Sequence, residues 1–109
     1  MSELENRFIE LEEKIKNAES QGQSINDYVI EQINILKQSL DEFIEQALSQ
    51  GYRRDDIRVG EIEVQQYRVM EKLASKINLP TDDYEKLIKE AQIRVLGEDV
   101  YNAHVNDNS

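Results

Sequence analysis

Residues 25–50 form a continuous stretch with helical apolar periodicity and without proline or glycine, and this stretch limits the possible folds more than any other. Steps of three and four residues between apolar positions are typical of one face of an α-helix. A 26-residue helix spans about 39 Å, whereas a compact chain of this size is roughly 34 Å across. We therefore expect an elongated molecule, or a helix that continues into a partner chain. The apolar stripe consists of Val29, Ile33, Leu36, Leu40, Phe43 and Ala47.

The first 20 residues carry a second stripe, with the a/d spacing of slightly more than two heptads. Its leading members are Leu4, Phe8, Leu11 and Ile15. Two heptads are too short for a stable solitary coil, so this stripe must dock on another element. It can fold back across the turn at residues 21–23 as a helical hairpin, or serve as a dimerising arm. We expect self-association, with a closed dimer as the favoured oligomer, because such dimers are the commonest assemblies.

Two more helices are predicted, over residues 61–78 and 81–96. The segment 52–60 is compatible with a loop, a single helical turn or two short strands, because apolar and polar residues alternate there. The chain is thus expected to be all-α with four helices, over 2–20, 25–50, 61–78 and 81–96. We predict one domain over 1–97 and a disordered or frayed tail over 98–109, which ends in Asn-Asp-Asn-Ser.

Acidic residues dominate the composition, with 23 Asp and Glu against 13 Lys and Arg, for a net charge of −10. This charge disfavours direct binding to nucleic acid or to an anionic membrane, since both require clustered cations. It favours a protein partner with a basic surface. The chain has no cysteine, which is compatible with a cytoplasmic location and removes thiol chemistry.

One basic segment interrupts the acidic chain. Tyr52, Arg53, Arg54 and Arg58 follow the long helix closely and form the candidate binding segment. Tyr and Arg are the residue types most enriched in binding hot spots. Cations are also favoured at the C-terminal end of a helix by its dipole, which gives these arginines an ordinary structural explanation.

No grouping of residues predicts catalysis. His104 is the only histidine, the four glycines are isolated, and the acids, Glu61 and Glu63 among them, are expected on polar helix faces. General acid–base catalysis needs a carboxyl in an apolar pocket, and a metal site needs convergent ligands. We therefore expect no catalytic residue, no cofactor and no metal ion.

The sequence favours a small acidic interaction protein without enzymatic activity, such as an adaptor, an assembly factor or an inhibitor. Two alternatives remain open. The first is an acidic decoy that imitates nucleic acid and occupies a basic site. The second is an oligomer that binds an anionic small molecule through the candidate binding segment.

Overall fold

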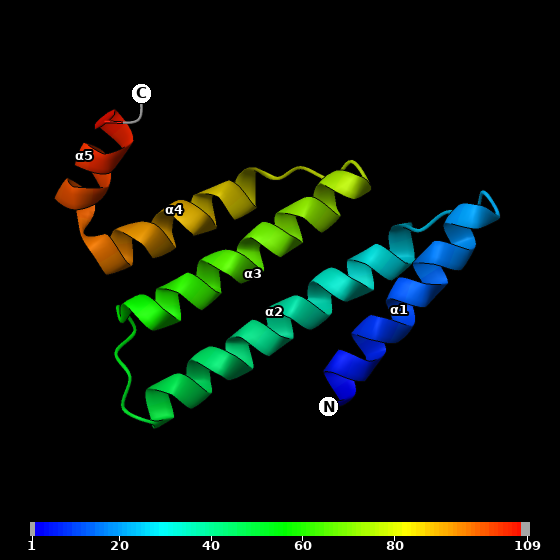
Figure 1. Cartoon of the computed structure of the whole chain (residues 1–109), viewed down its shortest axis with the longest axis horizontal. Coiled ribbons are helices and arrows are strands. Elements are labelled where there is room, and N and C mark those ends of the chain that lie inside the picture. Colours follow the sequence, from blue (N-terminus) through cyan, green and yellow to red (C-terminus); the bar gives the residue numbers. More distant parts are fainter. Residues whose placement is uncertain (1, 108–109) are drawn as a thin grey trace.

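The computed structural model describes residues 2–107 of the chain. Within this range the chain is all-α and contains no strand, as predicted (Figure 1). It has one helix more than the four expected. The helices are α1 (Glu3–Ser20), α2 (Asn26–Ser49), α3 (Ile57–Lys76), α4 (Asp82–Leu96) and α5 (Glu98–Asp107).

Helices α1 to α4 lie side by side in one layer and follow one another in chain order, and α5 turns away from the end of α4 (Figure 1). Each helix packs on the next, and among the described residues close backbone approach is confined to these neighbouring pairs. The molecule measures 50 × 37 × 16 Å and has a radius of gyration of 16.3 Å, against about 13 Å for a compact chain of 100 residues. The elongated shape that the long apolar stripe predicts is confirmed.

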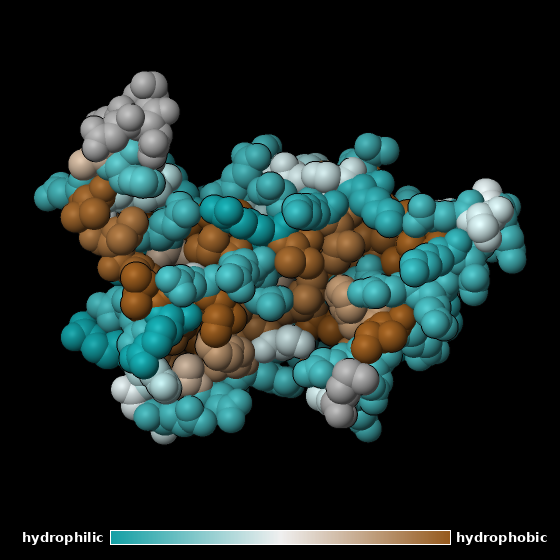
Figure 2. All heavy atoms as spheres, in the orientation of Figure 1, coloured by the Kyte–Doolittle hydropathy of each residue, from teal (hydrophilic) through white to brown (hydrophobic). Residues whose placement is uncertain are grey.

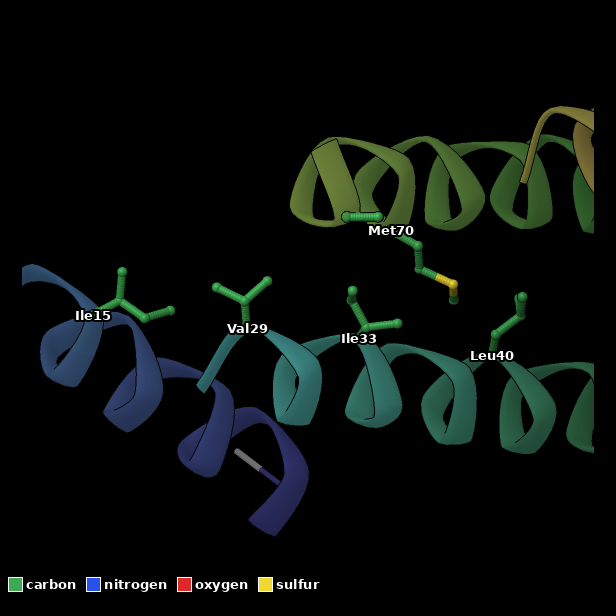
Figure 3. Close-up of a cluster of buried hydrophobic side chains, with 6 residues drawn as sticks. Ile15, Val29, Ile33, Leu40 and Met70 are labelled. Atoms are coloured by element: carbon green, nitrogen blue, oxygen red, sulfur yellow. The ribbon is translucent and has the colours of Figure 1, made fainter. Parts of the chain in front are cut away.

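The main core cluster joins α1, α2 and α3. Its side chains leave α1 and α2 toward the same side, where a methionine of α3 meets them (Figure 3). Burying each aliphatic or methionine side chain contributes about 1.5–3 kcal/mol, so this cluster holds the first two helices against the third. The labelled members are Ile15, Val29, Ile33, Leu40 and Met70, all buried.

The first two helices form the antiparallel hairpin that is one of the two arrangements expected for the N-terminal stripe. Gly22, with φ of +70°, reverses the chain between them. Leu11 and Ile15 are buried within the chain, while Leu4 and Phe8 are half-buried. Two of the four residues of the predicted self-association stripe, Leu11 and Ile15, are therefore already buried by contacts within one chain.

The third helix begins at Ile57, four residues earlier than predicted. Asp56 precedes it with an extended backbone, and its carboxylate accepts a hydrogen bond from the backbone N–H of Arg58 at 2.8 Å. Asp is one of the preferred residues for such a cap. Residues 52–60 are therefore a short loop followed by the first turn of α3, and the two-strand interpretation is wrong.

Residues 98–107, predicted to belong to a tail, form α5. Gly97, with φ of +86°, separates α5 from α4, and its carbonyl accepts a hydrogen bond from the backbone N–H of Tyr101 at 3.0 Å. In the described range α5 packs on α4 alone. Residues 108–109, the end of the predicted tail, lie outside the described residues.

Candidate functional site

A carboxylate that is almost inaccessible to solvent ties three elements together. The Glu63 side chain of α3 is only 2% exposed. Arg54, in the loop before α3, donates from Nη1 to Oε1 at 2.8 Å and from Nη2 to Oε2 at 3.0 Å. Arg94 of α4 donates to Oε1 at 2.9 Å, and the Tyr67 hydroxyl donates to Oε2 at 3.0 Å. One buried carboxylate thus fixes the loop, α3 and α4 to each other.

The charges in this cluster are set by opposing effects. Burial alone would raise the pKa of Glu63, but hydrogen bonds from Arg54 and Tyr67 and the charges of Arg54 and Arg94 outweigh it, so the pKa is lowered. Burial, the Glu63 charge and the hydrogen bond to Glu63 raise the pKa of Tyr67 to about 12. The carboxylate is therefore ionised and the phenol is neutral across the physiological pH range.

The Glu63 cluster has the chemistry of a structural ion pair. A general base needs a pKa near the working pH and a free lone pair aimed at its substrate. Glu63 has a lowered pKa, and both of its oxygens accept hydrogen bonds from within the chain. Buried ion pairs of this kind are strongly destabilising when one partner is removed, because the other charge is left uncompensated.

The expectation that acidic residues lie on polar faces is wrong for Glu63, although Glu61 is exposed as expected. The four-residue spacing from Glu63 to Tyr67 is visible in the sequence. Arg54 and Arg94, however, lie 9 and 31 residues from Glu63. Only the packing of the loop and α4 against α3 brings these charges together.

In the structure, the four residues of the candidate binding segment do not gather at one site. The Arg58 guanidinium lies over the Tyr52 ring, 4.7 Å from its centroid. These two residues line the end of a surface groove. Arg54 instead turns toward the buried carboxylate, and Arg53 is the most exposed of the three arginines.

Each arginine of this segment already has a carboxylate partner. Arg53 pairs with Asp55 at 3.0 Å and Arg58 pairs with Asp56 at 2.9 Å, while Arg54 is held by the buried cluster described above. The two outer pairs are exposed, and such pairs contribute little stability. An anionic ligand at this segment would have to compete with these carboxylates.

A groove of about 350 Å³, the α3–α4 groove, lies between α3 and α4. Its apolar lining comes from both helices, and polar side chains, among them Glu61 and Arg68, complete it. Ile57 is 56% exposed there, and Leu96 is also exposed. The small and apolar lining residues are Ile57, Gly60, Val64, Ala91, Val95 and Leu96.

A second groove, of about 320 Å³, lies between the end of α2 and the start of α3. It has an apolar lining and ends at the Tyr52–Arg58 pair. The sequence places Phe43, Ala47 and Ile62 in helical stripes and Val59 in the unassigned segment 52–60, but it does not reveal which of them stay uncovered. The apolar lining residues are Phe43, Ala47, Val59 and Ile62.

Comparison of the chain with models of protein families, with curated proteins and with solved structures finds no match. In residues 2–107, no group of three or more His, Cys, Asp or Glu side chains is placed to hold a metal ion. No helix of this part of the chain is long and apolar enough to cross a lipid bilayer. A function therefore has to be inferred from the geometry of the chain itself.

Proposed function

We propose that this chain is a small non-enzymatic interaction protein that binds a helix of another protein in the α3–α4 groove. The observation that carries the proposal is the uncovered apolar surface of this groove, where Ile57 and Leu96 are exposed beside polar side chains. An amphipathic helix places its apolar face in such a groove and uses residues at i, i+3 or i+4, and i+7 as anchors. An apolar patch bordered by polar residues is typical of an interaction site.

The charge of the surrounding chain indicates what the partner helix should carry. Residues 79–109, which include α4 and α5, hold seven acids and three bases. The charged lining of the groove itself is Glu61 and Arg68, so Lys and Arg residues of the partner would meet Glu61 in the groove and the acids of α4 and α5 beyond it. Complementary charge speeds the encounter and fixes the orientation of the bound helix, while the apolar anchors supply most of the affinity. An adaptor, an assembly factor or an inhibitor acts through occupancy of this kind.

Selection from a displayed library of helical peptides tests the proposal and does not require the partner to be identified first. We expect wild-type protein to enrich peptides with two or three apolar anchors at helical spacing and with Lys or Arg beside them. Ile57→Asp should lose these peptides, because it places a charge against the apolar anchor. The acid suits the first turn of α3, so the fold should survive.

The matched control is Ile30→Asp. Ile30 is an exposed isoleucine of α2 that does not line the α3–α4 groove. This variant should retain the enriched peptides with unchanged affinity. Enrichment of purely basic peptides without apolar anchors, bound equally well by Ile57→Asp, would contradict the proposal and favour an acidic decoy. In that case binding should also weaken steeply between about 50 and 200 mM salt.

A further inference from the structure

The layer has a second uncovered surface, formed by one face of α2 and one face of α3. On each helix the positions recur at steps of three and four residues, so they share a side of the helix. On α2 and the residue that caps its C-terminal end they are Leu36, Ser39, Phe43, Gln46 and Gln50. On α3 they are Ile62, Gln66, Val69, Leu73 and Lys76. We call these ten positions the α2–α3 face.

Both halves of the α2–α3 face meet in the second groove, which is lined by Phe43 and Gln46 of α2 and by Ile62 of α3. Val69 is 40% exposed and Ile62 is also exposed. Figure 2 shows apolar side chains gathered along the middle of the layer, over α2 and α3, with hydrophilic side chains around them. Apolar side chains interspersed with hydrophilic ones therefore lie across α2 and α3 without a second layer of helices to cover them.

This face contains no acidic residue, although 23 of the 109 residues of the chain are Asp or Glu. Its one charged member is Lys76, whose ammonium group pairs with Glu19 of α1 at 3.1 Å. The remaining polar members are a serine and three glutamines, which are neutral. A net charge of −10 ordinarily opposes self-association, because the acidic residues of two copies repel each other. Here those acidic residues lie outside the α2–α3 face.

The exposed area of the chain is larger than expected for a monomer. The chain exposes 7619 Å², whereas a compact monomer of 12.7 kDa exposes about 6,200 Å², a difference of roughly 1,400 Å². A standard protein–protein interface covers about 800 Å² on each partner. The excess is therefore large enough to supply one complete interface, and stable domains normally pack two layers around a core.

We infer that a second copy of this chain covers the α2–α3 face, so that two single layers pack face to face about a twofold axis into a helical bundle. The face suits an isologous contact because it is largely apolar, its one charged member is already paired with Glu19, and each copy presents the same surface. The exposed amides of Gln46 and Gln50 are neutral groups that can hydrogen-bond across such a contact.

This contact uses a different surface from the α3–α4 groove, so each of the two proposals can be tested and rejected independently of the other. Light scattering and sedimentation from about 1 to 100 µM measure the mass in solution. Wild type should approach twice 12.7 kDa. Val69→Asp should be monomeric, with a dissociation constant raised at least about 100-fold, because it buries a charge in the contact. Circular dichroism checks that the variant stays helical.

Ile30→Asp is the matched control, since Ile30 is 41% exposed, close to the exposure of Val69. Ile30 lies about 120° around α2 from Leu36, so this variant should remain dimeric. Ile57→Asp should also remain dimeric even where it loses peptide binding. A wild type that stays at 12.7 kDa throughout the concentration range would overturn the inference.

Cross-linking gives a second, independent test. The chain has no native cysteine, so Val69→Cys and Ile30→Cys each introduce one unique thiol. A short bismaleimide should join Val69→Cys chains into a covalent dimer and leave Ile30→Cys chains largely single. A dimer that survives Val69→Asp, or that cross-links at position 30 and not at 69, would show that another surface holds the copies together.

Discussion

The Val95 side chain of α4 occupies the space beside Gly60 of α3 into which any side chain at position 60 would extend. A Cβ atom at position 60 would collide with the Val95 side chain. Glycine inside a helix costs about 1 kcal/mol relative to alanine, so this residue weakens α3 locally. In return α4 approaches α3 closely beside position 60, near the point where Arg94 reaches Glu63.

Replacing Gly60 with alanine should therefore destabilise the protein, although alanine is the better helix former. We expect the free energy of unfolding to fall by about 1–3 kcal/mol, because overpacking forces the helices apart. Urea denaturation followed by circular dichroism measures the loss. Combining Gly60→Ala with Val95→Ala should recover part of it, since the second change creates room. A stabilised single variant would show that α4 does not press against this position.

Replacing Glu63 with glutamine should cost about 2–4 kcal/mol of unfolding free energy. The amide cannot neutralise Arg54 and Arg94, and both arginines would keep part of their desolvation cost. Glu61→Gln is the matched control two residues away, where the side chain is exposed, and it should change stability by less than about 0.5 kcal/mol. Equal effects of the two variants would contradict the structural role of the cluster.

The lowered pKa of Glu63 also predicts that the difference in stability between wild type and Glu63→Gln depends on pH. The folded pKa of Glu63 is lowered from an ordinary value of 4.5, so the carboxyl is protonated more readily in the unfolded chain. Its stabilising contribution is therefore complete above that ordinary value and is lost as the pH falls through the folded pKa. In denaturation curves between pH 7 and pH 3, the difference in stability between wild type and Glu63→Gln should narrow as the pH falls below 4.5. Curves that stay parallel would argue against the lowered pKa.

Tyr67 should contribute a late step to the ionisation of the tyrosines, and substitution is needed to assign this step because burial also raises the pKa of Tyr84. The pKa of Tyr67 is raised to about 12, so folding is favoured fully below the ordinary value of 10.0 and this contribution is lost as the pH rises toward 12. An ultraviolet titration of the folded protein should contain a late step that disappears in Tyr67→Phe. If Tyr67→Phe leaves the late step in place, another group produces it.

The intrachain hairpin predicts that Leu11 contributes to stability without regard to protein concentration. Leu11→Ala should cost about 2–5 kcal/mol, because Leu11 is completely buried. Leu4→Ala, at a half-buried position of the same stripe, should cost less. The loss for Leu11→Ala should be the same in dilute and concentrated protein. If the loss of stability is smaller at one protein concentration than at the other, α1 pairs with another copy instead.

Periodicity predicts α1 to α4 because each of them buries apolar residues, but it misses α5, which lies in the predicted tail. The second helix lies within one residue of its predicted ends. Periodicity misses the start of α3 because Gly60 resembles a break, and only the neighbouring α4 explains a glycine inside a helix. The Glu63 cluster escapes prediction for a related reason, since its two arginines converge from segments that are distant in sequence. What the sequence does not show is which stripes remain uncovered, because that depends on how the layer is assembled.

The neighbour-to-neighbour packing of the helices also determines how the chain acquires its structure. Since each helix packs mainly on the next one along the chain, most contacts join residues that are close in sequence. Chains with such local contacts fold within microseconds to milliseconds, because little loop-closure entropy is lost before each contact forms. When a terminal helix opens, it loses its contacts with only one neighbouring helix. We therefore expect α1 and α5 to exchange their amide protons before α2 and α3 do. For the same reason, we expect the centre of the layer to form first and the two terminal helices to close last.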